Sequence, residues 1–503
     1  MSLHRNRFVH LAAATCLGVG AVVTTAAPAL ADPPGSEQPP GRAEGHPPPG
    51  PEEWQPVQQS PAEPLYDLDW TIADPRYDWS AAGPGAEFVP LTDAAGAPIS
   101  RVLYGVHQGA AYRIEVPLDW NGDVVFWEHG YRGTGTTLHV SDPGYDLRRT
   151  YVEDGYAWAA SSYSANRYDI EAGVRSTEAL ARLFDRLVGR ADQRYLQGVS
   201  MGGHVIGVLL ERDRGVEWAG AAPMCGVMGD RELYDFFLDY NLLAQTLAGV
   251  DAYPFPADYL TEDVPDIQAA LRTPAGTLNE RGEVLRDLVT EISGGPRPGD
   301  DAAFDFWEGQ DFVYGVVATE PGGLDGVAPG AVWTNADTDY PDELVTPDGS
   351  PFTFPDGDTL DERVERVVPA PQARRSGPSA YVPDITGSFD VPVLSVHTLG
   401  DYYVPFSMEQ HYAADALEQG NADLLVQRAV RAAGHCEFTP QEAASQFLDL
   451  VTWAEEGDRP AGQSVLDRDL VASPDYGCEF STPLDPATPA EQTTRDLYEP
   501  CLP

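Results

Sequence analysis

Two kinds of hydrophobic pattern alternate along this chain. Short apolar runs are typical of buried strands, and they occur at residues 100–107, 111–116, 124–127, 157–162, 194–199, 218–223, 391–396 and 424–430. Other segments repeat apolar residues every three or four positions, as on a helix that packs by one face, and these cover residues 180–188, 205–210, 406–417 and 447–451. The first two strands predict a hairpin. The alternation as a whole predicts an α/β domain, with a mostly parallel central sheet and helices on both faces.

The alternation stops between residues 229 and 389, where Asp, Pro, Gly and aromatic residues dominate and helical spacing occurs only in scattered runs. This stretch follows one predicted strand and precedes another, so it is an insertion at the carboxyl ends of the strands. Ligands bind at that edge of an open α/β sheet. We therefore expect residues 231–389 to form a lid over a core made of residues 65–230 and 390–460.

The last predicted helix has a clear start. Thr439-Pro440-Gln441-Glu442 combines an N-cap threonine, a proline at the first helical position and a glutamate at the third, which is a capping box. We expect this helix to pack through Phe447, Leu448 and Val451.

The first 64 residues have the composition of a leader and a linker. Arg5 and Arg7 precede an apolar run from Phe8 to Val23, and Ala29-Leu30-Ala31 follows. This is the order of a secretory signal peptide, so residues 1–31 are predicted to be removed and the protein to be secreted. Residues 32–64 are rich in Pro, Gly, Glu and Gln and predict an extended linker. Residues 461–503 form a tail outside the α/β pattern, and no membrane insertion is expected after the leader.

The charge of the chain argues against some classes of binding partner. Its 503 residues include 79 acidic and 31 basic residues, for a net charge of −48, and all the basic residues are Arg. Such a surface repels nucleic acids and anionic membranes, so neither is expected to bind. Two explanations of the acidity stay open: a saline habitat, or a composition that favours Arg over Lys with a solvated acidic surface.

Cysteine usage agrees with secretion. Cys16 lies in the predicted signal peptide, which leaves Cys225, Cys436, Cys478 and Cys501. An even number of cysteines in a secreted protein favours disulfides, and four cysteines allow three pairings. Cys478 and Cys501 are close in sequence and are expected to clip the tail, which leaves Cys225 to pair with Cys436.

The sequence Gly198-Val199-Ser200-Met201-Gly202 joins the strand at 194–199 to a helix. In this context a G-x-S-x-G sequence forms a sharp turn, and its small flanking residues let the serine hydroxyl project above the sheet edge. The N-terminus of the following helix directs N–H groups to the same place. Ser200 is therefore the predicted nucleophile for attack on a carbonyl carbon.

A nucleophilic serine needs a base and an acid that orients the base. His435 follows the strand at 424–430 through a short loop and is the predicted base. Asp401 follows the strand at 391–396 and is the predicted acid. The other candidates lie on helices, at the amino ends of strands or out of the order Ser…Asp…His: His204, His397, His411, Asp390, Asp423 and Glu409.

The oxyanion of an acyl-transfer reaction needs N–H donors. One is expected from Met201, the residue after the nucleophile. The other is expected from Tyr131, in the sequence His129-Gly130-Tyr131-Arg132-Gly133 that follows the strand at 124–127. Gly130 is expected to supply the backbone freedom that turns the Tyr131 amide inward.

The His129-Gly130-Tyr131 loop, the Ser200 turn, Asp401 and His435 occur in an order that resembles the secreted serine hydrolases of the α/β-hydrolase fold superfamily. The resemblance covers residues 95–230 and 390–460, and it implies the α/β-hydrolase fold with a Ser-His-Asp triad. As a whole the chain resembles secreted actinobacterial α/β-hydrolases.

A histidine followed by a cysteine is also similar to the tannase and feruloyl esterase group. In that group the cysteine after the histidine is bridged to a cysteine before the nucleophile. Position 199 is Val in this chain, so Cys225 is expected to supply the partner of Cys436 instead.

These features predict a secreted hydrolase that cleaves a small or polymeric carboxylic ester through an acyl-enzyme and needs no cofactor. Aromatic residues in the predicted lid favour a partly apolar ester. A peptidase or amidase on the same scaffold is the alternative, followed by a secreted binding protein that kept the fold. Asp356, Asp358 and Asp361 do not have the spacing of an EF-hand, and no metal is expected.

Overall fold

The computed structural model describes residues 78–79, 88–212, 215–318, 321–346, 348–377, 380–482 and 494–501. The predicted signal peptide and linker lie outside the described residues. Within the described ranges, no helix combines the length and the hydrophobicity that crossing a bilayer would require.

An eight-stranded sheet has the order β12-β11-β8-β7-β4-β6-β3-β2. Its strands are β2 (Ser100–His107), β3 (Ala110–Pro117), β4 (Val124–Glu128), β6 (Ala157–Ser161), β7 (Arg194–Val199), β8 (Gly220–Met224), β11 (Val393–Thr398) and β12 (Leu425–Val430). β3 pairs antiparallel with β2 and β6, and the other neighbours pair in parallel. The predicted hairpin and mostly parallel sheet are therefore confirmed.

Helices cover both faces of this sheet. Alternate residues of each strand point to opposite faces, so every strand contributes to two hydrophobic cores. In β4, the buried Val124 and Phe126 belong to the core on one face, and the buried Val125 and Trp127 belong to the core on the other. The first core includes residues of α2 (Ile170–Leu187), α3 (Met201–Glu211) and α10 (Ser407–Gln419), and the second includes residues of α1 (Leu147–Glu153) and α11 (Pro440–Glu456). Strands buried on both faces explain the short apolar runs in the sequence.

Helix α11 begins with the predicted capping box. The Thr439 hydroxyl accepts a hydrogen bond from the Glu442 amide (3.1 Å), and the Glu442 carboxylate accepts one from the Thr439 amide (2.9 Å). Phe447 and Val451 are buried, but Leu448 is 39% exposed, so the prediction that Leu448 packs inward is wrong. The reason is geometric: the buried stripe of the helix runs through Phe447, Leu450 and Val451.

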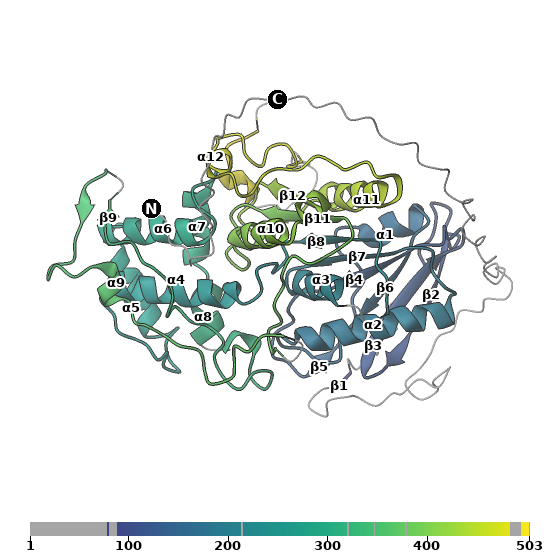
Figure 1. Ribbon diagram of the computed structural model, residues 1–503, viewed down its shortest axis with the longest axis horizontal. Helices are drawn as coiled ribbons and strands as arrows, with labels where there is room; N and C mark the ends of the chain where they lie inside the picture. Colours follow the sequence, from purple (N-terminus) through teal and green to yellow (C-terminus); the bar gives the residue numbers. More distant parts are fainter. Residues whose placement is uncertain are drawn as a thin grey trace, which may run out of the picture.

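Between β8 and β11 the chain leaves the sheet and forms a helical layer. We use this name for α4 (Glu232–Ala248), α5 (Asp263–Leu271), α6 (Glu280–Ile292), α7 (Asp300–Glu308), α8 (Asp311–Ala318) and the short α9 (Leu360–Arg363). Figure 1 shows these helices together at one end of the molecule, away from β2 and β3. The layer is far more regularly helical than its scattered sequence signals predicted. Helix α4 is buried along most of its length, so its sequence lacks a one-sided apolar stripe.

Short elements complete the structure. They are the bridged pairs β1 (Asp78–Trp79) with β5 (Thr137–Leu138) and β9 (Leu344–Val345) with β10 (Pro351–Phe352), the single turns η1 (Pro321–Gly323), η2 (Ala422–Leu424) and η3 (Arg495–Leu497), and α12 (Arg468–Val471). The acidic cluster noted in the sequence lies around α9, where Asp356 and Asp358 form ion pairs with Arg363, and Asp361 pairs with Arg366.

The two connections between the sheet and the helical layer are tied to each other. The Asp230 carboxylate accepts a hydrogen bond from the Ile385 amide (3.0 Å), and Arg231 forms an ion pair with Asp384. Asp230 is buried, and burial raises its pKa to about 7. The entrance and exit of the insertion therefore lie side by side.

Candidate functional site

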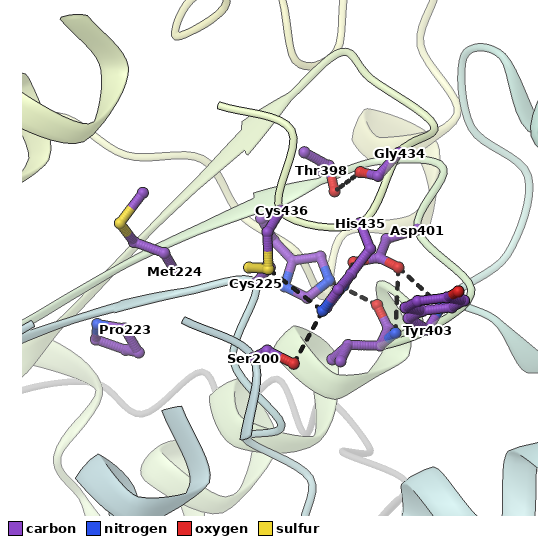
Figure 2. The surroundings of a disulfide bond; sticks show 12 residues. Ser200, Pro223, Met224, Cys225, Thr398, Asp401, Tyr403, Gly434, His435 and Cys436 are labelled. Carbon is purple, nitrogen blue, oxygen red and sulfur yellow. Dashed lines mark hydrogen bonds and ion pairs between the residues drawn. A yellow bond between two sulfur atoms is a disulfide. The ribbon is translucent and has the colours of Figure 1, made fainter. Parts of the chain in front are cut away.

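Three strands bring distant side chains to one edge of the sheet. Ser200 follows β7, Asp401 follows β11 and His435 follows β12, all at the carboxyl ends of parallel strands. His435 Nε2 lies 2.9 Å from Ser200 Oγ, although the two residues are 235 positions apart. His435 Nδ1 lies 2.6 Å from Asp401 Oδ2. Figure 2 shows the hydroxyl, the imidazole and the carboxylate in a continuous row.

The backbone at Ser200 has φ 57° and ψ −124°, a conformation that residues with a Cβ rarely adopt. The Ser200 amide donates to the Met224 carbonyl at the end of β8 (3.0 Å). The flanking glycines are required because the end of β4 passes close by: a Cβ added at Gly198 or Gly202 would lie 2.4 or 2.3 Å from the Glu128 carbonyl oxygen. This is the sharp turn that the sequence predicted.

Asp401 is fully buried and its carboxylate is held from both sides. Oδ1 accepts hydrogen bonds from the amides of Tyr403 (2.8 Å) and Val404 (3.2 Å), which leaves Oδ2 to face His435 Nδ1. Because a carboxylate accepts and cannot donate, Nδ1 carries the proton of the neutral imidazole. The lone pair of Nε2 is then directed at the Ser200 hydroxyl, as general-base chemistry requires.

The loop after β4 passes beside the serine hydroxyl. A Cβ built on Gly130 would lie 3.0 Å from Ser200 Cβ and 3.5 Å from Ser200 Oγ. The φ of Gly130 is not positive, so the glycine is needed for space and not for the backbone freedom that the sequence suggested. Tyr131 follows directly, and Met201 is the first residue of α3, where N–H groups have no acceptor within the helix.

A buried carboxyl group lies beneath this loop, and sequence reasoning missed it. Glu128 accepts hydrogen bonds from Thr177 Oγ1 (2.7 Å) and Tyr163 Oη (2.9 Å). Tyr163 Oη also donates to the His129 carbonyl (3.2 Å), and its ring stacks on the His129 ring with the centroids 3.9 Å apart. Burial raises the pKa of Glu128 to about 7, although both hydroxyl contacts oppose the shift. A charged residue closing the apolar strand Val124–Glu128 was the available signal.

The His435 loop is bonded covalently to the neighbouring strand. Cys436 forms a disulfide with Cys225, the residue after β8, with their Cα atoms 5.3 Å apart. The Cys436 carbonyl also accepts a hydrogen bond from Tyr145 Oη (2.7 Å). Figure 2 shows the bridge beside the imidazole.

The second disulfide joins Cys478 to Cys501, so the structure contains both bridges that the sequence favoured. The sulfurs of Cys225 and Cys436 and a ring nitrogen of His435 lie within 4.8 Å of one another. Because these two sulfurs are bonded to each other, neither is a thiolate ligand for a metal.

Aromatic rings flank His435 on the side of the helical layer. The ring of Tyr403 lies 5.2 Å from the His435 ring, measured between centroids. Phe312 of α8 and Trp307 of α7 pack on Tyr403, with centroid distances of 3.7 and 4.6 Å. One aromatic ring therefore lies beside the imidazole, and two rings of the helical layer pack behind it.

The helical layer also holds the loops that carry Asp401 and His435. Trp307 Nε1 donates to the carbonyls of Gly400 (2.7 Å) and Ala433 (2.9 Å), each one or two residues before a site residue. Arg297 Nε donates to the Leu399 carbonyl (2.6 Å). The insertion thus contacts the site through backbone groups of both loops.

Two other histidines that the sequence offered lie elsewhere. His204 is buried between Tyr168 Oη (3.0 Å) and the Pro383 carbonyl (2.8 Å), and burial lowers its pKa to about 4. His397 is buried beside the Val404 carbonyl (2.8 Å) and 3.4 Å from Glu409. Burial works against the charged form of His397, but Glu409, Asp401 and the Val404 carbonyl together outweigh it, so the pKa of His397 is raised.

Comparison with known proteins gives distant relatives. No protein-family model matches the chain. The o-phthalyl amidase of Xanthobacter agilis is 24% identical over 409 residues, which cover 70% of this chain and 87% of the amidase.

Similar solved structures include feruloyl esterase B from Aspergillus oryzae (13% identical, TM-score 0.34, covering 75% of this chain and 86% of the esterase). Est1E from Butyrivibrio proteoclasticus is 12% identical with a TM-score of 0.32, and covers 70% of this chain and 99% of Est1E. An acylaminoacyl peptidase from Pyrococcus horikoshii has the same identity and TM-score, covering 73% of this chain but only 43% of the peptidase.

These similarities are low, so the classification depends on the architecture of the chain itself. The sheet is parallel except at the β2–β3–β6 edge, a serine occupies a strained turn between β7 and α3, and the Gly130 loop passes beside its hydroxyl. This sheet and this turn are those of the α/β-hydrolase fold.

Proposed function

We propose that the protein is a serine hydrolase that cleaves carboxylic esters through an acyl-enzyme intermediate. The observation that carries the proposal is the hydrogen-bonded row from Ser200 Oγ through His435 to the buried Asp401 carboxylate. A buried carboxylate that fixes the imidazole tautomer, with Nε2 on a serine hydroxyl, is the arrangement that activates serine for acyl transfer.

The proposed reaction has two halves. Ser200 Oγ attacks the ester carbonyl carbon while His435 Nε2 takes the hydroxyl proton, and the tetrahedral intermediate then collapses. His435 returns the proton to the departing alkoxide, so an alcohol leaves and the acyl group stays on Ser200. Water then attacks the acyl carbon, His435 takes its proton, and collapse releases the acid and restores the serine hydroxyl.

The backbone amides of Met201 and Tyr131 are proposed to bind the oxyanion in both halves. Met201 begins α3, and the Gly130 backbone lies against the Ser200 side chain, so both amides belong to segments next to the hydroxyl. Such donors contribute about 3 kcal/mol each to transition-state stabilisation.

We propose a partly apolar, aromatic substrate. The imidazole faces the ring of Tyr403, and Phe312 from α8 packs on that ring. Apolar and aromatic walls with a few polar groups are typical of small-molecule sites. The net charge of −48 disfavours polyanionic substrates. In this proposal residues 231–389 act as a lid, because Trp307 of α7 and Phe312 of α8 pack on Tyr403, whose ring lies beside the imidazole.

An amide is the second candidate substrate. One relative, similar over 70% of this chain, is an o-phthalyl amidase, and the same Ser-His-Asp chemistry cleaves amides when the leaving amine is protonated. An identity of 24% is too low to transfer the substrate of that relative to this chain, so the ester stays the first proposal.

Secretion is also proposed, with cleavage after Ala31. Two disulfides favour an oxidising compartment. Expression in a secreting bacterial host, followed by mass determination of the protein in the medium, tests this. Retention of the full-length chain in the cytoplasm contradicts it.

A fluorophosphonate probe tests the catalytic proposal directly, because it labels only an activated serine. We expect stoichiometric labelling of the wild type, none of Ser200→Ala, and hydrolysis of p-nitrophenyl esters that falls roughly a million-fold in the same variant. An unlabelled, folded wild type contradicts the proposal and favours a binding protein.

Paired substrates distinguish an esterase from an amidase. The wild type is assayed on aryl esters and on the anilides with the same acyl groups, and Ser200→Ala serves as the control for each. Turnover of anilides without turnover of the matching esters favours the amidase and contradicts the ester proposal.

A further inference from the structure

The loop that carries His435 is held on one side by the tail of the chain. We use the name His435 loop for residues 431–437, between β12 and α11. Figure 1 shows the yellow tail beside β12 and α11. The described part of the tail includes residues 494–501, and these contact the loop at several backbone groups.

Thr494 makes the central contact. Its hydroxyl oxygen accepts hydrogen bonds from the amides of Ala433 (3.0 Å) and Gly434 (2.9 Å), and its proton is donated to the Glu437 carboxylate. A hydroxyl has two acceptor sites and one donor, so these three bonds use its full capacity. Gly434 immediately precedes His435, so the hydroxyl fixes the backbone on which the imidazole is mounted.

Residues on either side of Thr494 extend this contact. Arg495 donates to the Glu437 carbonyl (2.7 Å) and forms a buried ion pair with Glu442 of α11 (2.6 Å). Tyr498 Oη donates to the Ala432 carbonyl (3.0 Å). The tail therefore contacts the loop both before and after His435.

The start of the His435 loop also contacts the tail, whose described residues form two arms, 461–482 and 494–501. Arg431, at the start of the loop, is buried. It donates to the carbonyl of Tyr476 in the first arm (2.9 Å) and to that of Glu499 in the second (3.0 Å). The Cys478–Cys501 disulfide joins the same two arms. The tail thus contacts the start of the loop from both of these arms, which the disulfide joins.

We propose that Thr494 is a positioning residue for hydrolysis, which keeps His435 aligned between Ser200 and Asp401. This inference rests on the proposed function. The His435 loop has no regular secondary structure, so its backbone is fixed by contacts from outside. The Cys225–Cys436 bridge fixes the residue after His435, and Thr494 fixes the residue before it. A misplacement of about 1 Å in a catalytic group lowers turnover by roughly a hundredfold.

The test compares Thr494→Ala with Thr494→Ser. Alanine removes the hydroxyl and leaves two amides of the loop without their acceptor, whereas serine keeps all three hydrogen bonds. Thr334→Ala is the matched control, since Thr334 is also a buried threonine whose hydroxyl bonds backbone groups, at Val367 and Ala336 in loops between β8 and β11. The assay measures kcat and KM on a p-nitrophenyl ester.

For Thr494→Ala we expect kcat to fall roughly 10- to 100-fold with KM changed less than about threefold. Thr494→Ser is expected to keep kcat within about threefold of the wild type, and Thr334→Ala to do the same. Equal kcat for Thr494→Ala and wild type overturns the proposal. Equal loss in the Ala and Ser variants, or an equal loss in Thr334→Ala, also overturns it, because the effect would then not come from this hydroxyl.

Amide hydrogen exchange separates this inference from the proposed function. We expect the amides of Ala433 and Gly434 to exchange at least tenfold faster in Thr494→Ala than in Thr494→Ser, whatever the protein hydrolyses. An unlabelled wild type with this exchange difference overturns the hydrolase and keeps the loop contact. A labelled, active wild type without the difference overturns the role of Thr494 alone.

Discussion

Two glycines beside Ser200 have different physical roles. A Cβ at Gly202 would lie 2.3 Å from the Glu128 carbonyl oxygen, a backbone atom that cannot move aside. A Cβ at Gly130 would lie 3.0 Å from the Ser200 Cβ, which requires only a small displacement of the Ser200 side chain. The fold therefore requires the first glycine, and the position of the proposed nucleophile requires the second.

We predict that one alanine variant mainly loses stability and the other mainly loses activity. Gly202→Ala should lose about 3 kcal/mol of unfolding free energy, because backbone must shift to admit the methyl group. Gly130→Ala should stay within about 1 kcal/mol of wild type while kcat falls by roughly tenfold or more. Urea denaturation and ester hydrolysis on both variants check this. Full activity in Gly130→Ala contradicts the placement of the oxyanion loop.

Glu128 gives the second prediction at this scale. Burial raises its pKa from 4.5 to about 7, so the folded protein binds this proton more tightly than the unfolded chain does. The stability that Glu128 contributes is therefore full below about pH 4.5, and it is lost as the pH rises to about 7. The size of the loss is up to about 3 kcal/mol.

The Glu128→Gln variant cannot ionise, so it should escape this loss. We expect its unfolding free energy, relative to wild type, to be higher at pH 8 than at pH 5, by up to about 3 kcal/mol. Other buried carboxyl groups with raised pKa values, such as Asp123 and Asp230, are present in both proteins and cancel in the difference. A difference that is the same at the two pH values shows that Glu128 is ionised throughout.

Among elements, the loops that follow β8 and β12 are joined by a bond and not only by packing. The Cys225–Cys436 bridge spans 211 positions of sequence. A loop of this length gives at most about 5 kcal/mol of stabilisation in the chain-entropy description. The same bridge anchors the residue next to His435, so its removal should affect the position of the imidazole as well as stability.

We therefore predict that Cys225→Ala/Cys436→Ala lowers kcat at least tenfold under conditions in which the variant is still folded. The Cys478–Cys501 bridge stays intact in this variant, so the effect belongs to one disulfide. Circular dichroism gives the folded fraction, and ester hydrolysis gives kcat for that fraction. Unchanged kcat in a variant verified to lack the bridge contradicts the prediction.

At the scale of the whole molecule, the net charge of −48 dominates the long-range electrostatic contribution to stability. Acidic residues outnumber basic residues by 79 to 31, so the compact state is opposed by self-repulsion at neutral pH. Salt screens this repulsion over about 10 Å at 0.1 M and about 3 Å at 1 M. The ion pairs around α9 are exposed and contribute little in return.

Added salt should therefore stabilise the protein. We expect Tm to rise by several degrees between 0.05 and 1 M NaCl at pH 7.5, since the repulsion opposes the compact state more than the expanded chain. KCl should act like NaCl, because screening depends on ionic strength. Scanning fluorimetry at matched protein concentration measures the shift. A flat or falling Tm shows that exposed ion pairs outweigh the repulsion.

The chain alone determined the core of this fold, because its signals are local. Buried strands give apolar runs wherever they pair, and the glycines around Ser200 and the Thr439–Glu442 cap depend only on their neighbours in sequence. The predicted strands and the serine turn are therefore confirmed, whereas the roles of the candidate base and acid stay predictions. Leu448 was misassigned because each helical residue is rotated by about 100° from the one before it, which turns Leu448 out of the buried stripe of Phe447, Leu450 and Val451.

The tertiary structure decided what depends on contacts between distant segments. The helical layer is buried on many sides, so its helices lack the one-sided pattern that reveals a helix in sequence. Burial also sets the protonation of Glu128, and folding alone brings Thr494 to the backbone before His435. Which residues are adjacent across 60 or 235 positions is a property of the packed chain, since sequence periodicity reports only how each segment meets its own surroundings.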